Sequence, residues 1–513
     1  MTGSRIGWAG LVCLVAWAPG GHAAPVRSPA GVKGALVSRL WSAAEAHRRA
    51  GRHKQCGRAF ETLAKRFPRH PRADAMLFNA AACHEGGGDV RAAIRTRKGL
   101  LQRYARSRLA PTTLHYLAGC YQRVVLVADA AGAYERFTSR YPRRKEAPGS
   151  LMRAIGLRGG LGQARLVKRN VSHFIKRYGR RYPARAARAF WFWVEYSRVH
   201  GKAAAFETAL GSYLRRYARR GTVDRTVEAM AKLGRIHWRR SCRIPTDNGI
   251  CRRAIRVKQR GSSKRRRTHK YVVRSGVSVS TAKRYFNRAL KVWAKGRAVI
   301  KIPKHAADRR ARLVNLRHFA AFAAFMRAEV GLDPYLRVGA PTFPRVVGDR
   351  RKAKRSYRKY RQWLGTKKKA GNRLVKAYMN VVTGGRGRAP GKRRGDPEWS
   401  IAAVYRTGVI FRSIAQRAKE VRLPKVRGAV GSRLGGLPSP MEPAKVAARF
   451  RKKALGAFEL CVQLAKRLRW HDKWERRCRT GLRELLPKKH PKAKERFLRP
   501  GQHRPTIDRA GFR

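Results

Sequence analysis

Four stretches of this sequence end alike and are evenly spaced. An aromatic residue closes each stretch, and these aromatics, Phe67, Tyr104, Tyr141 and Tyr178, lie 37 residues apart. An alanine follows each aromatic by 6 residues and opens the next apolar run, so a second marker keeps the same interval. A unit of this length with two amphipathic helices cannot bury its apolar face alone and must stack on its neighbours. The period therefore predicts an all-α solenoid of helical hairpins.

The residues inside each unit follow a common pattern. Ala81 and Ala118 are small residues in the first helices of two successive units, and a ring side chain follows each by three positions. In a second helix, Ala130 precedes the aromatics Tyr134 and Phe137. This pattern resembles the tetratricopeptide repeat (TPR) family over five units, at about residues 36–221. The resemblance implies a right-handed α-α superhelix whose concave face binds an extended or helical segment of a partner.

The chain departs from the family in three places. Its period is 37 residues, whereas the family's is about 34. The first helix of the fourth unit, AFWFWVEY at residues 189–196, has no small residue at the expected site. Residues 126–128 stand where a glycine turn is usual.

The repeats are expected to continue to about residue 300, giving a repeat region over residues 36–300. A sixth first helix is expected at residues 223–238 and its partner at residues 281–293, with a basic loop inserted over residues 239–280. Residues 301–487 then form a region of longer helices, expected at residues 306–330, 350–382, 397–421, 442–468 and 472–486. The basic residues 488–513 are expected to be a mobile tail.

One stretch of the second half carries a further resemblance. Residues 395–408, GDPEWSIAAVYRTG, and a closing helix pair with Trp474 and Pro487 look like features of large exported TPR proteins of myxobacteria and their relatives. Asp396 is expected to cap the helix that begins there. The resemblance implies a periplasmic scaffold associated with envelope proteins. This chain has Arg and Lys where those proteins have Glu, so a shared partner is not implied.

The charge of the chain is strongly one-sided. Against 123 Lys and Arg stand only 27 Asp and Glu, a net charge of +96. Such a field attracts polyanions. Two interpretations stay open: a surface that binds nucleic acid, lipopolysaccharide or anionic polysaccharide, or solvated helix faces that carry cations as a lineage bias or an adaptation to acid. The candidate polyanion-binding residues are Arg252, Arg253, Arg256, Lys264, Arg265, Arg266, Arg267, Lys270, Arg350, Arg351, Lys354 and Arg355.

The N-terminus has the features of an export signal. Arg5 precedes an apolar core over residues 6–18, and small residues lead to Ala23, after which we expect cleavage. No later run approaches ~18 uncharged apolar residues, the length that a membrane-spanning helix needs. We therefore expect residues 1–23 to be removed and the mature chain to be a soluble periplasmic protein, with secretion or association with the outer membrane as alternatives.

The cysteines that remain after cleavage suit an oxidising compartment. Three pairs are candidate disulfides, Cys242–Cys251, Cys461–Cys478 and Cys56–Cys83. The first pair flanks a short segment of turn-forming residues, and each of the others lies at about equal depth on the two sides of an expected turn. The three pairs leave Cys120 single. The alternative is that Cys83 and Cys120, 37 residues apart, fill equivalent buried sites.

Stacked hairpins bind partners with the side chains of their first helices. The candidate partner groove lies in the fourth unit and consists of Trp191, Trp193, Tyr196, Arg181, Arg185 and Arg188. The aromatic residues would anchor a partner segment and the arginines would receive its acidic side chains. The alternative is that this aromatic helix is sandwiched between neighbours and buried nearly all round.

Motifs for catalysis are missing from the sequence. There is no HExxH and no paired CxxC, and the neighbours Cys83 and His84 point in different directions on a helix. Residues 385–392, GRGRAPGK, lack the glycine spacing and the Ser or Thr of a phosphate-binding loop. We therefore expect no enzyme, metal, cofactor or small-molecule substrate. The expected partners are envelope proteins or, alternatively, anionic polymers.

Overall fold

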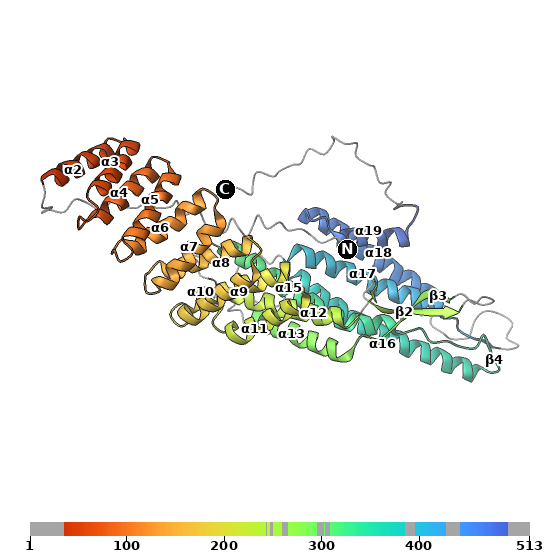
Figure 1. Ribbon diagram of the computed structural model, residues 1–513. Coiled ribbons are helices and arrows are strands. Elements are labelled where there is room, and N and C mark those ends of the chain that lie inside the picture. The colour runs from red at the N-terminus through yellow and green to blue at the C-terminus, as the bar shows by residue number, and fades with distance from the viewer. Residues whose placement is uncertain are drawn as a thin grey trace. The chain divides into compact units, whose positions relative to one another are not determined.

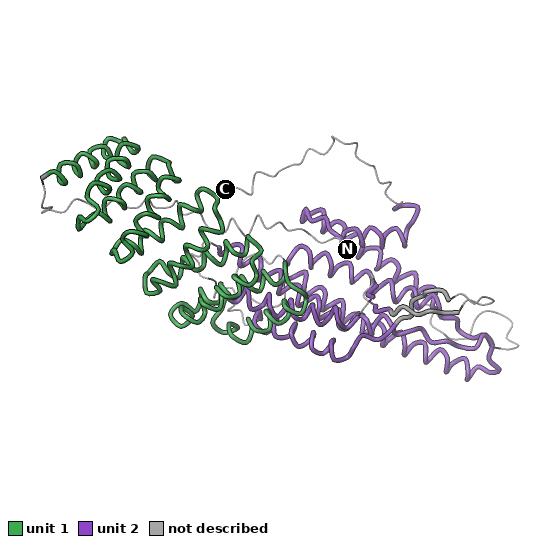
Figure 2. Tube along the Cα trace, in the orientation of Figure 1, with its two compact units in different colours: residues 1–222 green, residues 223–513 purple. Residues whose placement is uncertain are grey.

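The computed structural model describes residues 35–242, 244–246, 250–258, 265–294, 302, 308–384, 395–426 and 442–490 (Figure 1). The chain divides into two compact units, residues 1–222 and 223–513 (Figure 2). Helices make up nearly all of the regular structure in the described residues. The predicted all-α fold is confirmed. The predicted signal peptide lies outside the described residues.

The first unit is a series of helical hairpins. Its helices are α2 (Ala35–Arg49), α3 (His53–Arg66), α4 (Ala73–Gly86), α5 (Val90–Arg103), α6 (Ala110–Arg123), α7 (Val127–Arg140), α8 (Ala147–Gly160), α9 (Ala164–Tyr178), α10 (Pro183–His200) and α11 (Ala203–Tyr217). Each helix packs against the next one in the chain (Figure 1). The first helices of three successive repeats begin at Ala73, Ala110 and Ala147, which are the alanines that mark the period. The predicted stacking of consecutive hairpins is confirmed within this unit.

The turn inside each hairpin repeats its backbone conformation. A residue with positive φ stands at Gly51, Gly88, Val125 and Gly162, with φ values of 68°, 80°, 61° and 70°. Glycine adopts this left-handed conformation without a steric penalty, whereas a β-branched residue rarely does. Val125 therefore makes the turn that glycine makes in the neighbouring hairpins, so the hairpin keeps its geometry although the expected glycine is missing.

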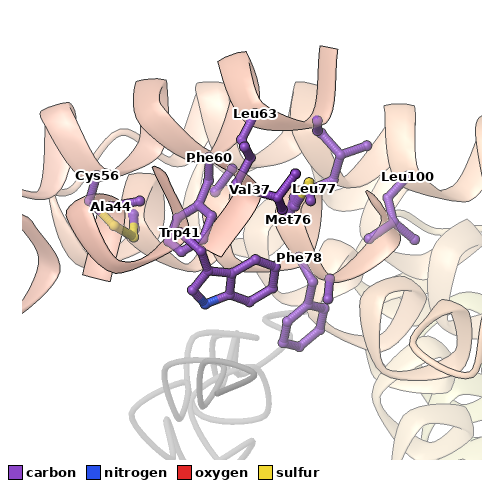
Figure 3. Packing of buried hydrophobic residues seen from close by; sticks show 14 residues of the cluster. Val37, Trp41, Ala44, Cys56, Phe60, Leu63, Met76, Leu77, Phe78 and Leu100 are labelled. Atoms are coloured by element: carbon purple, nitrogen blue, oxygen red, sulfur yellow. A yellow bond between two sulfur atoms is a disulfide. The ribbon is translucent and has the colours of Figure 1, made fainter. Parts of the chain in front are cut away.

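Apolar side chains from the first two hairpins form a shared core. In the first hairpins, Trp41 meets Phe60 edge to face, with ring centroids 5.4 Å apart and planes at 84°. Both rings belong to a buried cluster that also includes Met76, Phe78 and Leu100 from the next hairpin (Figure 3). The cluster joins three helices or more because each hairpin leaves one apolar face for its neighbour to cover.

The second unit contains longer helices and a few short strands. Its elements are α12 (Val223–Arg240), β1 (Ile244–Pro245), β2 (Cys251–Lys258), β3 (Arg265–Tyr271), α13 (Gly276–Ala294), α15 (Arg309–Arg337), β4 (Val346–Val347), α16 (Arg350–Val382), α17 (Pro397–Glu420), β5 (Lys425–Val426), α18 (Pro443–Leu468) and α19 (Lys473–Leu485). Helices α12, α13 and α15 pack on one another, α16 packs between α15 and α17, and α17 packs on α18 and α19. Asp396 Oδ1 accepts a hydrogen bond from the Trp399 amide at 3.2 Å, so the predicted cap of α17 is confirmed.

Glycines allow the last three helices to approach closely. Phe458 of α18 is fully buried, and its ring lies against Gly408 of α17 and Gly481 of α19. A Cβ atom at Gly408 would be 2.4 Å from that ring, and one at Gly481 would be 2.8 Å from it. Side chains at these two positions would therefore push the helices apart.

The segment between α12 and α13 differs from the prediction. Residues 239–280 were expected to form a basic loop, but β1, β2 and β3 form an antiparallel sheet in that order. Residues 252 to 258 of β2 pair with residues 271 to 265 of β3, from Arg252 opposite Tyr271 to Lys258 opposite Arg265. The residue types in β2 explain the difference, because Ile255 and Val257 favour strands although the many arginines suggest a solvated loop. A second, parallel pair joins β4 to β5.

Three disulfides join cysteines within the described residues. They join Cys56 to Cys83 across α3 and α4, Cys242 to Cys251 at the start of the sheet, and Cys461 to Cys478 across α18 and α19. Among the described residues Cys120 is a buried free cysteine. Burial raises the pKa of its thiol.

Candidate functional site

Half-buried carboxylates join successive repeats of the first unit. Oε1 of Glu61 in α3 accepts a hydrogen bond from the Thr96 hydroxyl of α5 at 2.5 Å. The same oxygen lies 3.1 Å from Nε2 of His84 in α4. The bond with His84 is the main cause of the lowered pKa of Glu61. One carboxylate thus ties its own helix to both helices of the next hairpin.

The same arrangement recurs two repeats later. Glu135 of α7 accepts two hydrogen bonds from Arg158 of α8, both at 2.9 Å, and one from Asn170 of α9 at 2.7 Å. Burial acts to raise the pKa of Glu135, but the hydrogen bonds from Arg158 and Asn170 outweigh it and lower the pKa. In between, Glu85 pairs with the buried Arg97 and with Arg123 at 3.0 Å.

In the second unit a buried glutamate joins three helices. Glu329 of α15 receives two hydrogen bonds from the buried Arg406 of α17, at 2.7 and 2.9 Å, and one from Tyr378 of α16 at 2.6 Å. Burial alone would lower the pKa of Arg406, but Glu329 raises it, so the guanidinium stays charged. Sequence reasoning missed this connector, since Tyr378 and Arg406 lie 49 and 77 positions from Glu329 in the chain.

A buried lysine closes the end of α15. Lys367 of α16 is 1% exposed, and its Nζ donates to the carbonyl oxygens of Tyr335 at 2.6 Å and Val338 at 3.1 Å. Burial lowers the pKa of Lys367 to about 8, and the charge of Arg417 adds to the effect. This amine therefore joins the end of α15 to α16. Nothing in the residue pattern around Lys367 distinguishes it from the exposed cations of the same helix.

The predicted partner groove in α10 is mostly core. Trp191 is 6% exposed and packs edge to face on Tyr213 of α11, with centroids 4.9 Å apart. Tyr196 is 4% exposed, and its hydroxyl donates to the Gly162 carbonyl at 2.7 Å. These two residues are not groove anchors, and that part of the prediction is wrong. The physical reason is the alternative given above, because a helix packed between two neighbours buries aromatics on several sides.

The remaining groove residues lie closer to solvent. Trp193 is half-buried and stacks on Tyr196 with the ring planes at 13°. Arg181 and Arg185 are exposed, and their guanidinium groups lie 5.5 and 5.1 Å from the centroid of the Tyr182 ring. Arg188 is exposed as well. The structure thus leaves the half-buried Trp193 on α10, and exposed cations on this helix and in the turn before it.

The predicted polyanion-binding residues fall into two groups. Arg350, Arg351, Lys354 and Arg355 are exposed in the first turns of α16. Arg252 is half-buried at the start of β2. Lys264 lies outside the described residues, and the side chains of Arg253, Arg256, Arg265, Arg266, Arg267 and Lys270 also lie outside what the structure describes.

Helix α16 carries cations along its whole length and no acid. Of its 33 residues, 13 are Lys or Arg and none is Asp or Glu. Eight buried positions form its inner face, and apart from Lys367 and the half-buried Lys368 all of its cations are exposed. Cations near a helix N-terminus oppose the helix dipole, so the cluster at the start of α16 is unfavourable until an anion meets it.

The described residues hold no group of three or more His, Cys, Asp or Glu side chains arranged to bind a metal ion. None of the described helices has an apolar stretch long enough to cross a membrane.

Comparisons with known proteins find similarity at the level of solved structures. No family model matches the chain, and no curated protein sequence matches it. A tetratricopeptide repeat protein from Parabacteroides merdae is 12% identical with a TM-score of 0.27, and the match covers 58% of this chain and 94% of that one. Yeast Tom70 is 9% identical with a TM-score of 0.20, and the match covers 88% of each chain. The TPR domain of P58(IPK) is 10% identical with a TM-score of 0.20, and the match covers 89% of this chain and 100% of that one.

Proposed function

We propose that this protein is a non-enzymatic scaffold of the cell envelope, exported to the periplasm, that holds other proteins together. The observation that carries the proposal is the stack of hairpins in the first unit, which exposes side chains over many helices. Glu61 and Glu135, at joints of this stack, are paired with other side chains. Such stacks bind partners over extended surfaces. A catalytic role would need acids, bases or nucleophiles that converge on a pocket, whereas Glu61, Glu135 and Glu329 are engaged in joining helices.

The compartment is part of the same proposal. The features of residues 1–23 support export, and the three disulfides suit an oxidising compartment. The resemblance of residues 395–408 to exported TPR proteins of myxobacteria supports the same location.

Affinity purification tests this proposal. The full-length protein, tagged at its C-terminus, is expressed at its native level, crosslinked in cells and purified from the envelope fraction after nuclease treatment. The proposal predicts a small set of envelope proteins that stay bound in about 0.5 M salt, where exposed charge pairs are strongly screened. Recovery of the tagged protein alone, or in the cytoplasmic fraction only, would overturn it.

A second candidate function, polyanion binding, is favoured by α16 alone. Its exposed cations extend along a helix of 33 residues without an acid, and such a length corresponds to about 50 Å. A strip of this kind matches a chain of phosphates or sulfates better than a single carboxylate. The binding would depend steeply on salt, because each neutralised phosphate releases counterions.

A charge-matched pair of variants tests this second candidate. One variant replaces four exposed cations of α16 by glutamine, at Arg351, Lys354, Arg355 and Arg358. The control replaces four exposed cations of α3 and α5, at Lys54, Arg58, Arg91 and Arg95. We expect the first variant alone to weaken binding of duplex DNA or lipopolysaccharide more than about tenfold and to flatten the slope of log K against log salt by about 3 to 4. Equal losses in both variants would mean that the binding follows total charge and not α16.

A further inference from the structure

The second repeat lacks the carboxylate that the first and third repeats have on their second helices. Glu61 and Glu135 stand two repeat lengths apart, and midway between them the equivalent position is Lys98. Each glutamate bonds to the residues 23 and 35 positions further on. At those distances from Lys98 stand Tyr121 and Ala133. The ammonium of Lys98 only donates hydrogen bonds, so it cannot accept the bonds that Glu61 and Glu135 receive. The joint between α5 and the hairpin of α6 and α7 is therefore not closed in the same way.

A groove opens at this joint. It has a volume of about 660 Å³ and runs between α5 and α7 over α6. Its apolar floor consists of Leu101, Leu114, Leu117 and Tyr121. The equivalents of Leu117 in the neighbouring repeats are Ala80 and Ala154, so the floor is more apolar here than elsewhere in the stack. Its volume lies in the range of pockets that take a ligand group of several apolar atoms.

The rim of the groove is positive. Lys98, Arg136 and Arg140 line it and are exposed, and no acid does so. Arg140 donates to the Ala105 carbonyl at 3.2 Å, and within the described part of the chain neither Lys98 nor Arg136 forms an ion pair. Asp129, whose charge adds to the effect of burial in raising the pKa of Tyr121, lies outside the lining.

We propose that this groove binds an acidic amphipathic segment of a partner protein, with apolar side chains over the leucines and carboxylates against Lys98, Arg136 and Arg140. The proposal rests on the scaffold function and names the chemistry of one partner contact. A floor of leucines favours a peptide over a nucleic acid or a sugar polymer, because burying a phosphate or hydroxyl on it would cost free energy without a compensating hydrogen bond. The three cations favour carboxylates on the segment and repel basic ones.

The test uses the full chain and a synthetic probe. The probe is a fluorescein-labelled peptide of about four helical turns, with leucine at every third or fourth position and glutamate at most others. One control peptide has serine in place of each leucine and keeps the charges. A second has lysine in place of each glutamate. Fluorescence anisotropy at about 0.15 M salt reports binding, and unlabelled duplex DNA serves as a competitor.

Two substitutions on the same helix separate the groove from the general charge. Lys98→Glu reverses a charge on the rim and restores the acid of the neighbouring repeats, whereas Arg95→Glu makes the same change at an exposed position of α5 outside the lining. We expect Lys98→Glu to weaken binding of the leucine peptide by at least about tenfold and Arg95→Glu to change it less than about threefold. Equal helicity and equal urea midpoints of both variants control for folding.

Four results would overturn the proposal: no binding of the leucine peptide, equal binding of the serine peptide, equal losses in the two variants, or full displacement by DNA. A failure of the groove is distinguishable from a failure of the scaffold function. If Lys98→Glu retains all envelope proteins in affinity purification while the leucine peptide does not bind wild type, the scaffold stands and the groove proposal falls.

Discussion

Glu135 occupies the position of Glu61 two repeats further along the chain, and each carboxylate bonds to both helices of the hairpin that follows it. The chain has only 27 acidic residues, and these two are half-buried at joints of the stack. Acidic and basic residues therefore differ in where they lie in the first unit. Acids hold the hairpins together inside, and most of the excess cations stay on the outside.

Removing one of these acids should destabilise the stack. Glu135→Ala leaves Arg158, with 11% of its side chain exposed, without its carboxylate partner. Breaking a buried pair in this way costs about 2 to 4 kcal/mol. Urea unfolding followed by circular dichroism measures the loss. The control, Asp129→Ala, removes an exposed acid from the first turn of the same helix and should cost less than about 1 kcal/mol. Equal costs would show that Glu135 is not a connector.

The left-handed turn residue of the third hairpin is a site for stabilisation. Val125 has φ of 61° and is 76% exposed. Val125→Gly should raise the free energy of unfolding by about 1 kcal/mol, since the left-handed conformation costs about 1 to 2 kcal/mol for a residue with a Cβ. The reciprocal change, Gly88→Val at the equivalent turn, should lower it by a similar amount. Thermal unfolding of both variants measures this, and a destabilising Val125→Gly would contradict the turn assignment.

The cysteines give a prediction that needs no variant. In the exported protein, denatured without reductant, a maleimide should react with one thiol, that of Cys120. After reduction it should react with seven, because the chain has 8 cysteines and the proposed cleavage after Ala23 would remove Cys13. The folded protein should not react, because Cys120 is buried and burial raises the pKa of its thiol. Mass spectrometry counts the adducts, and several adducts without reductant would mean that the disulfides do not form.

Lys367 predicts a pH dependence of stability. Its pKa is lowered to about 8 in the folded chain, and an unfolded lysine titrates near 10.4. Between these values the unfolded chain binds a proton that the folded chain does not, so stability rises with pH. Relative to Lys367→Met, the wild type should therefore gain on the order of 2 kcal/mol from about pH 8 to about pH 10. Urea unfolding at several pH values measures this difference, and a flat difference would show that the amine is not buried in its charged form.

The sequence was sufficient for the stack of hairpins because the period depends on local chemistry. Two markers recur at one interval: an aromatic residue at the end of each second helix, and an alanine at the start of the helix that follows. Hairpins of this length bury their apolar faces by packing on the neighbouring hairpins in chain order. The α10 groove was mispredicted because Trp191, Phe192 and Trp193 point in several directions around one helix. Periodicity alone does not say which side a neighbour covers.

Two other features depend on contacts that are distant in sequence. The many basic residues of the segment 252–270 suggested a solvated loop, but β2 and β3 pair there as antiparallel strands. Their register depends on backbone pairing and not on charge. The groove beside Lys98 becomes visible only when three repeats are compared position by position and the floor under them is known. In both cases the residue types are compatible with the observed feature, but the feature forms through contacts with residues elsewhere in the chain.

Site-specific photo-crosslinking in living cells shows directly whether the groove beside Lys98 contacts another protein. A benzoylphenylalanine residue is placed at Gln102, which is exposed and lines the groove, and in a separate strain at Arg91, which is exposed on the same helix outside the lining. We expect discrete protein adducts from position 102, few or none from position 91, and loss of the adducts when Lys98→Glu is added. Identical adduct patterns from both positions, or no protein adducts from any exposed position of the first unit, would contradict this expectation.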